Sequence, residues 1–367
     1  MMLTWYGYDH EALGRRLDET CGDHYGLRGS IFGDAFADQA FVHAFLRSVK
    51  HGRNPWFAEF AWCGGLIPGL TRWGALTQIG MGTDLVSFFR FDEVPHGQER
   101  DGYGLVGLHR KPGRIYREVA SFAKELARAK PVLDGTAAPR AEIAVLFSYD
   151  NHVEFARNHH PGFFSGMCGN GYSIHLSRHL QAIVGKNIPC DIVQPGDDFD
   201  AYRAIVVPAL FLVRAPLAEK LSRFAANGGT VVVASYSGFA DENGRILETP
   251  VPGPLGPLCG VEALDYQAPP PAAGPVSIVS TADGFLDAPI EPVLWFDEVT
   301  AARDVRVLAE IRNRYYGGKP AVTQRRVGKG WAWYVGAVLD DAGYARLYGA
   351  IVAALGLKPV MALPEGL

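Results

Sequence analysis

The chain has few cysteines and no cysteine motif. Its 367 residues include five cysteines, an odd number, with no Cys-x-x-Cys pair and no histidine at a spacing that suits zinc. They are scattered along the chain, at Cys21, Cys63, Cys168, Cys190 and Cys259. We therefore expect reduced thiols, no structural metal, and a fold that does not depend on disulfides.

A strong charge of either sign is also lacking. The formal net charge is −4, and no basic stripe with interleaved aromatic residues is present, so a nucleic-acid partner is not expected. No charged and apolar leader opens the chain, and no apolar run is long enough to cross a bilayer. These absences predict a cytoplasmic protein with no membrane partner, no cofactor, and a small, nearly neutral ligand.

The most informative stretch is residues 54–65, an apolar run that ends on one carboxylate and then becomes rich in glycine. Trp56 and Phe57 indicate a short buried strand, and Cys63-Gly64-Gly65 indicates the loop after it. Glu59 would then lie at the carboxyl end of the strand, where catalytic groups gather in parallel α/β folds. We select Glu59 as the first catalytic candidate, although a lone carboxylate there can equally cap a loop or pair with an arginine.

A βαβ unit follows from the neighbouring segments. Residues 83–91 predict a second aromatic strand, and residues 72–80 have the spacing of a crossover helix that ends at Gly80. Residues 111–130 predict a further helix. Upstream, we expect a strand over 1–9, a helix over 11–21, and a helix over 38–50 with Asp38 as its N-cap.

Residues 141–357 alternate strands and helices at a spacing typical of a parallel sheet covered on both faces. The expected strands cover residues 142–147, 189–193, 204–207 and 230–234, and the expected helices cover 170–184 and 215–226. We expect a turn at 148–151, extended connections and edges over 243–290, antiparallel strands over 305–335, and a closing helix over 342–355.

Several motifs, in order along the chain, carry a family resemblance. A glutamate at a strand end is followed by Gly64-Gly65, Trp73-Gly74-Ala75, Phe88-Phe89-Arg90, Gly97-Gln98-Glu99 and Pro112-Gly113-Arg114. This order resembles the last third of the catalytic barrel in family 42 glycoside hydrolases, the β-galactosidases. Residues 141–357 resemble the trimerisation domain of that family.

The resemblance implies an α/β fold: a partial (β/α) barrel over 1–130, a linker over 131–140, a flavodoxin-like or class I glutamine-amidotransferase-like doubly wound domain over 141–357, and a tail over 358–367. It implies a retaining glycosidase that acts on galactosides. Glu59 falls on the nucleophile of the family and Glu99 on a sugar-contacting glutamate. Trp62 and Phe89, near strand ends, are candidates for the walls of the sugar pocket.

A retaining glycosidase needs a second carboxyl group as acid/base. In the family this group is the glutamate of an Asn-Glu pair, and no such pair occurs in this sequence. Five carboxylates could stand in for it, although rim carboxylates are mostly solvated or paired: Asp9, Asp34, Asp92, Glu93 and Glu99.

Two other functions stay open. The chain could be a non-catalytic or split-enzyme part that serves as an oligomerisation module, or an esterase that uses Ser235 or Ser237. His175 and His179, four residues apart on one helix, have a metal-ligand spacing without an acidic partner, which is a weak signal. An incomplete barrel leaves an open sheet edge, so we also predict a homo-oligomer, a trimer or a dimer.

Overall fold

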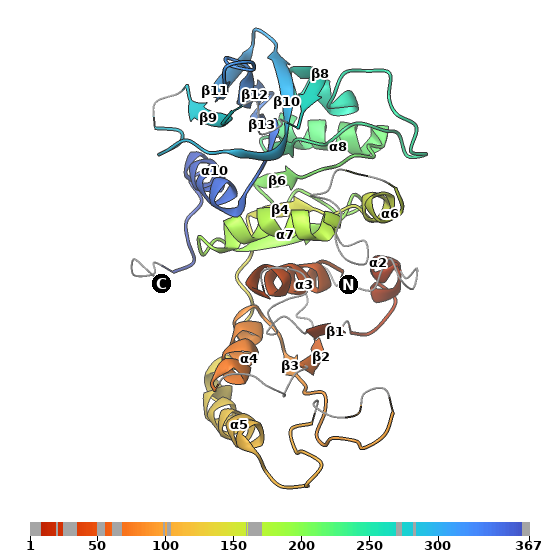
Figure 1. Ribbon diagram of the computed structural model, residues 1–367, viewed down its shortest axis with the longest axis vertical. Coiled ribbons are helices and arrows are strands. Elements are labelled where there is room, and N and C mark those ends of the chain that lie inside the picture. Colours follow the sequence, from red (N-terminus) through yellow and green to blue (C-terminus); the bar gives the residue numbers. More distant parts are fainter. Residues whose placement is uncertain are drawn as a thin grey trace. The chain divides into compact units, whose positions relative to one another are not determined.

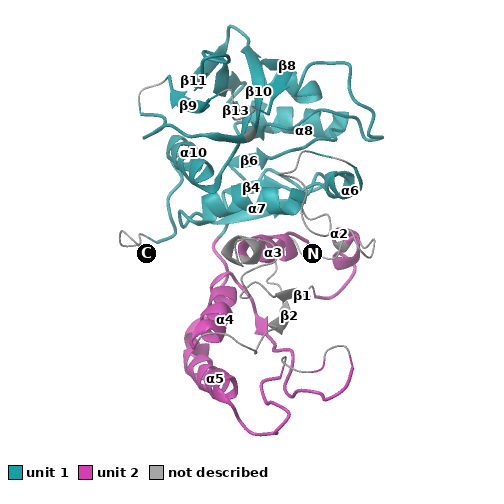
Figure 2. Ribbon diagram, viewed as in Figure 1, with its two compact units in different colours: residues 1–6, 140–367 teal, residues 7–139 magenta. Residues whose placement is uncertain are grey.

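The computed structural model describes residues 9–19, 21–24, 35–49, 56–60, 68–97, 100, 104–158, 160, 171–268, 274–281 and 284–361. The chain divides into two units, coloured separately in Figure 2. Unit 1 comprises residues 1–6 and 140–367, and unit 2 comprises residues 7–139. Each unit is described by itself below.

Unit 2 is built on a sheet of three parallel strands in the order β1-β2-β3. The helix α4 connects β2 to β3, as the βαβ interpretation predicted, and α3 precedes β2 (Figure 1). The elements of unit 2 are α2 (His10–Gly14), β1 (Cys21–His24), α3 (Ala35–Val49), β2 (Trp56–Phe60), α4 (Leu70–Gly80), β3 (Leu85–Val86) and α5 (Arg114–Leu133).

Helix spacing determines which side of α4 is buried. Thr71, Gly74, Ala75 and Gln78 recur at intervals of three and four residues, and all four are buried. The helix ends at Gly80, where the sequence predicted its end.

Several sequence predictions for unit 2 were wrong. A helix was expected to continue to Cys21, but α2 ends at Gly14 and Cys21–His24 is a strand. This strand has little intrinsic strand preference, and its pairing with β2 supplies the stabilisation. Asp38 is not an N-cap, because α3 begins at Ala35. The predicted strand over 83–91 is only two residues long, and the predicted strand over 1–9 lies almost entirely outside the described residues.

Unit 1 contains an eight-stranded mixed sheet in the order β5-β4-β6-β7-β13-β12-β11-β9 and a three-stranded sheet in the order β14-β10-β8. Its strands are β4 (Ile143–Leu146), β5 (Cys190–Val193), β6 (Ala204–Val207), β7 (Thr230–Ala234), β8 (Val261–Gln267), β9 (Ser277–Ser280), β10 (Pro292–Ala301), β11 (Val305–Arg312), β12 (Pro320–Val327), β13 (Gly330–Val335) and β14 (Ala337–Leu339). Its helices are α6 (Tyr149–Arg157), α7 (Gly171–Val184), α8 (Ala215–Ala226), η3 (Gly253–Leu255), α9 (Gly256–Cys259) and α10 (Asp341–Ala354).

The strand β13 joins the two halves of the large sheet. It pairs parallel with β7 and antiparallel with β12. From β5 to β13 every pairing is parallel, and from β13 to β9 every pairing is antiparallel.

Helices cover both faces of the parallel part (Figure 1). Alternate strand positions such as Leu146, Val207 and Val233 share one buried cluster with Leu221 and Phe224 of α8. On the other side, α7 contacts β4 and β5 and packs against α10. The α/β fold class predicted from the sequence is thus confirmed.

Two predictions for unit 1 need correction. The segment after β4 is not a turn: Ser148 accepts a hydrogen bond from the backbone N–H of Asn151 and caps the helix α6. Residues 243–290, expected as extended connections and edges, contain β8 and β9, each at the edge of its sheet, but also the two short helices η3 and α9, which were not expected. In unit 2, the helix α5 runs to Leu133 and so enters the segment 131–140 that was expected as the linker.

Candidate functional site

Glu59 lies on the central strand of the sheet in unit 2. It is the fourth of the five residues of β2, near the carboxyl end, and β2 has a parallel neighbour on each side. In parallel α/β sheets the carboxyl ends of the strands form the rim that binds ligands. The backbone position expected for Glu59 is therefore the one observed.

Asp23 of β1 is the register partner of Glu59. The strands β1 and β2 pair Asp23 with Glu59 and His24 with Phe60. No sequence signal pointed to Asp23, because the register between strands that lie more than thirty residues apart is not visible in a local pattern. Two acidic positions thus stand side by side at this rim.

Phe89 follows the short strand β3 and is half-buried. The guanidinium of Arg90 lies 5.2 Å from the centre of the Phe89 ring. The chain then pairs with a later segment, because the N–H groups of Leu105 and Val106 donate to the carbonyls of Arg90 and Phe91 at 2.8 Å each. The backbone directly after Phe89 is therefore fixed by hydrogen bonds to residues 105–106.

Three of the five carboxylates considered as stand-ins for the acid/base have structural roles. Asp9 accepts a hydrogen bond from the N–H of Ala12 at 2.9 Å and caps α2. Asp92 forms an ion pair with Arg110. Glu93 accepts from the N–H of Leu108 at 3.1 Å.

The other predicted site residues of unit 2 cannot be placed. Asp34, Trp62 and Glu99 lie outside the described residues, and for Glu59 only the backbone is described. Of the predicted catalytic and sugar-binding residues, Phe89 is the one whose side chain the structure describes.

Unit 1 has its own place where a ligand could bind. In a doubly wound sheet this is the point where the strand order reverses, at the carboxyl ends of the strands. Here that point lies between β4 and β6, because the chain goes from β4 to β5 on one side and to β6 on the other.

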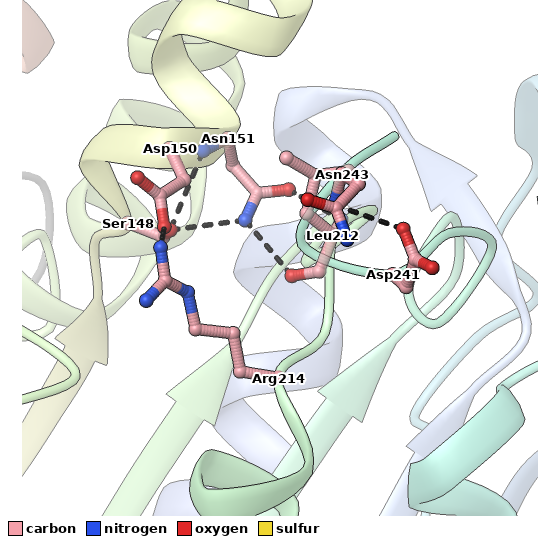
Figure 3. Close-up of polar contacts among 7 residues, drawn as sticks. All are labelled: Ser148, Asp150, Asn151, Leu212, Arg214, Asp241 and Asn243. Carbon is pink, nitrogen blue, oxygen red and sulfur yellow. Dashed lines mark hydrogen bonds and ion pairs between the residues drawn. The ribbon is translucent and has the colours of Figure 1, made fainter. Parts of the chain in front are cut away.

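The side chain of Asn151 spans this point (Figure 3). Its Oδ1 accepts from the N–H of Leu212 at 2.8 Å, and its Nδ2 donates to the carbonyl of Leu212 at 3.1 Å and to Oγ of Ser148 at 3.0 Å. Asn151 is fully buried. At the surface nearby, Arg214 pairs with Asp150 at 2.7 Å. Internal hydrogen bonds therefore engage both polar atoms of the Asn151 side chain.

The turn after β7 was the expected location of an esterase nucleophile. Ser235 and Ser237 are both buried, and Oγ of Ser237 accepts from the N–H of Leu210 at 2.9 Å. Ser235 Oγ has no hydrogen-bond partner within the described part of the chain. Neither serine therefore contacts a base that could activate it, among the residues that the structure describes.

Tyr236, between the two serines, has a positive φ of 65°. This left-handed backbone conformation is uncommon for a residue other than glycine. Its hydroxyl lies 3.1 Å from Nδ1 of His160, and Nε2 of His160 lies 3.4 Å from Oε1 of Glu154. Burial raises the pKa of Tyr236 and lowers the pKa of His160, although Glu154 opposes the second shift. The contact with His160 holds the hydroxyl of Tyr236.

The pair of histidines on α7 is buried rather than open to a metal. Nε2 of His179 lies 3.4 Å from Nε2 of His175, and Nδ1 of His179 lies 2.7 Å from the hydroxyl of Tyr348. Among the described residues, no three His, Cys, Asp or Glu side chains gather as a metal ion requires.

No helix in the described ranges is long and apolar enough to cross a membrane.

Comparison with known proteins identifies both parts of the chain. Residues 141–358 match the model of the β-galactosidase trimerisation domain, and residues 1–129 match the model of the β-galactosidase family. The chain belongs to the family 42 β-galactosidases. The resemblance that the sequence motifs indicated is confirmed.

Among its relatives in this β-galactosidase family is the β-galactosidase BgaB of Geobacillus sp. (strain Y412MC61), 29% identical over 302 residues, which covers 81% of the chain and 42% of the relative. The β-galactosidase LacZ of Lactobacillus acidophilus is 26% identical over 336 residues, covering 88% of the chain and 48% of the relative. The chain therefore spans about half the length of the curated relatives that it matches.

Solved structures of β-galactosidases share the fold. The crystal structure of the enzyme from Bacillus circulans sp. alkalophilus matches with a TM-score of 0.86 at 24% identity, over 99% of this chain and 54% of that chain. The enzyme from Rahnella sp. R3 matches with a TM-score of 0.86 at 23% identity, over 98% and 54% of the two chains.

Proposed function

We propose that this chain carries the nucleophile of a retaining β-galactosidase, and that Glu59 is that nucleophile. One observation carries the proposal: Glu59 lies near the carboxyl end of the central parallel strand, within the segment that matches the β-galactosidase family. In the reaction a carboxylate oxygen of Glu59 forms a bond to the anomeric carbon as the bond to the leaving oxygen breaks. Water then cleaves the glycosyl ester and regenerates the carboxylate.

The substrate class follows from the names of the relatives, which are β-galactosidases. We assign Glu99 to a hydroxyl of the sugar, and Trp62 and Phe89 to the apolar walls of the pocket. Aromatic rings suit this role because they pack against the C–H faces of a sugar. No cofactor is required, since the two carboxyl groups supply the chemistry.

The acid/base must protonate the leaving oxygen and later activate water. Asp9, Asp92 and Glu93 are poor candidates, because each is engaged in a cap, an ion pair or a backbone hydrogen bond. We therefore propose that the acid/base is Asp34, or Glu99 in place of the sugar-binding role assigned to it above, or a carboxyl group that another polypeptide or a neighbouring subunit contributes.

Hydrolysis of a nitrophenyl β-galactoside by the purified chain tests this proposal. Glu59→Gln should lower kcat by roughly a thousand-fold or more, since a nucleophile cannot be replaced by an amide. Glu125→Gln is the matched control and should keep full activity. It removes an exposed carboxylate of α5 that forms an ion pair with Arg72 of α4.

A rescue experiment separates a nucleophile from a structural glutamate. Glu59→Gly with added azide should regain activity and give a galactosyl azide of inverted configuration, because the small anion replaces the missing carboxylate. Loss of activity in Glu59→Gln without rescue would count against Glu59 as the nucleophile. An inactive wild-type chain would favour the second candidate function.

That second candidate is a non-catalytic or split-enzyme part that acts as an oligomerisation module. The match of residues 141–358 to a trimerisation domain favours it. We expect a homo-oligomer of the 39.9 kDa chain, a trimer or a dimer. Light scattering at micromolar concentration decides this, and a monodisperse monomer would refute it.

The cytoplasmic location stays a prediction, which fractionation of the producing cells tests.

A further inference from the structure

The strand β8 carries a strip of exposed side chains on unit 1. It lies at the edge of the three-stranded sheet, and Glu262, Leu264 and Tyr266 occupy alternate positions, so they share one side of the strand. Leu264 is 79% exposed and Tyr266 is 52% exposed. Large apolar side chains that are exposed next to each other mark a surface for contact with another molecule. We call Glu262, Leu264 and Tyr266 the β8 strip.

Tyr266 is held rigidly in this strip. Its ring stacks on the buried ring of Trp295, with the ring centres 4.1 Å apart and an angle of 19° between the planes. Nε1 of Trp295 in turn donates to Oδ1 of Asp297 at 3.0 Å. The ring of Phe239 packs edge-on against Tyr266 at 5.9 Å. A ring that is already fixed loses little conformational entropy on binding, and tyrosine is enriched among the residues that dominate interface energies.

The side chains of the strip are more available to a partner than its backbone. On one side β8 pairs with β10. On the other side the N–H of Ala263 donates to the carbonyl of Val251 at 2.7 Å, and the N–H of Val251 donates back at 3.0 Å. An added strand therefore cannot pair with the centre of β8, so a partner must contact the side chains.

A second exposed surface of unit 1 has the opposite charge. The tip of the hairpin between β11 and β12 carries Arg312, Arg314 and Tyr315, and all three are exposed, Tyr315 by 64%. The guanidinium of Arg314 lies 5.6 Å from the centre of the Tyr315 ring. Within the described part of the chain neither arginine forms an ion pair, and Glu262 of the strip forms none either. These charges are therefore available to a partner.

We infer that the β8 strip binds the hairpin tip of a second copy of this chain. The inference rests on the proposed role as an oligomerisation module, and residues 141–358, which contain both surfaces, match a trimerisation domain. A cyclic trimer joins two different surfaces of each chain, so the two must be complementary. The strip offers an apolar centre and a carboxylate, and the tip offers an aromatic ring and two guanidinium groups.

Sedimentation of a dilution series of the full chain tests this with Leu264→Asp. An aspartate buried in the contact should raise the concentration at which the oligomer dissociates into 39.9 kDa monomers by roughly thirty-fold or more. Val360→Asp replaces another exposed apolar residue of unit 1 and is the matched control, which should dissociate as wild type does. Circular dichroism establishes that both variants are folded.

A charge-reversal pair tests the contact if Leu264→Asp does not fold. Glu262→Arg and Arg314→Glu should each raise the dissociation concentration about tenfold, because each places like charges against each other, and the double variant should regain wild-type association. Wild-type dissociation in folded Leu264→Asp, or a double variant no tighter than the single ones, overturns the inference and leaves the oligomerisation module standing. A monomeric wild type refutes the module and the inference together.

Discussion

The hydroxyl of Tyr334 donates a hydrogen bond to Oδ2 of Asp297 at 2.7 Å, inside unit 1. Nε1 of Trp295 donates to Oδ1 of the same carboxyl group at 3.0 Å. Asp297 is buried, and burial raises its pKa to about 7, although the hydrogen bonds from Tyr334 and Trp295 oppose the rise. A carboxyl group with this pKa should make the stability of unit 1 depend on pH.

The first prediction concerns Asp297→Asn. An unfolded aspartate ionises near its ordinary pKa of 3.8, whereas burial raises the pKa of the folded group to about 7. The contribution of Asp297 to stability is thus fully present below pH 3.8 and is lost as pH rises through 7. The rise in pKa corresponds to roughly 4 kcal/mol, taken as an upper limit.

Urea unfolding at pH 5 and pH 8 checks this. The free energy of unfolding of Asp297→Asn, relative to wild type, should improve between the two pH values by up to roughly 3 kcal/mol, because about two of the three pH units of the shift lie above pH 5. Asp265→Asn, an exposed aspartate on β8, serves as the control. Equal pH dependence in Asp297→Asn and wild type would contradict the raised pKa.

The second prediction concerns the histidine pair on α7. Burial lowers the pKa of His175 to about 3 and holds the pKa of His179 well below its ordinary value, with His175 adding to the second shift. The contact between the two Nε2 atoms requires one atom to donate and the other to accept. Protonation of both rings would place two N–H donors against each other. These depressed pKa values stabilise the fold above pH 6.5, and that contribution is lost as pH falls toward 3.

At pH 5 the loss should be roughly 2 kcal/mol for His175, relative to pH 8. His175→Gln should therefore unfold less steeply with acid than wild type, as thermal melts between pH 5 and pH 8 would show. His109→Gln, which replaces an exposed histidine, should keep the wild-type slope. An unchanged slope in His175→Gln would refute the prediction.

The third prediction concerns Asn151. Asn151→Ala leaves the buried N–H and carbonyl of Leu212 without their side-chain partners, which should cost about 2–4 kcal/mol of unfolding free energy. Asp150→Ala removes only the exposed ion pair with Arg214 and should cost about 0–1 kcal/mol. Similar denaturation midpoints for the two variants would mean that the hydrogen bonds of Asn151 to Leu212 contribute little to the stability of unit 1.

The fourth prediction compares two glycines with nearly the same backbone. Gly238 and Gly244 have φ of 78° and 77°. A Cβ on Gly238 would lie 1.9 Å from the carbonyl oxygen of Pro252, whereas the nearest atom to a Cβ on Gly244 is 3.9 Å away. Gly244→Ala should cost only about 1–2 kcal/mol for the left-handed backbone, and Gly238→Ala should cost several kcal/mol more. Soluble expression and melting temperature of the two alanine variants check this.

The parts of the fold that the sequence revealed are those with a local pattern. Ile143–Leu146 and Thr230–Ala234 are short apolar runs of strand-forming residues, and α7 and α8 carry an apolar period of three to four residues. The strand Cys21–His24 was missed, because none of its residues prefers a strand and only the pairing with β2 makes it one.

The residues of the candidate site also divide into those with a local sequence pattern and those without one. The position of Glu59 near a strand end could be predicted, since an apolar run ends beside it and a glycine-rich loop follows. Asp23 could not, because its relation to Glu59 is a register between strands. Asn151 could not either, since its partner Leu212 lies 61 residues away along the chain.

The strand β13 has a consequence for how unit 1 opens. Its six residues hold hydrogen bonds to β7 on one side and to β12 on the other, so the parallel and antiparallel halves meet on a single segment. Neither half can detach while this segment stays paired, and releasing the segment frees both. Amide hydrogens of residues 331–335 should then be among the last to exchange with deuterated solvent, and they should exchange only through the cooperative unfolding of the entire sheet.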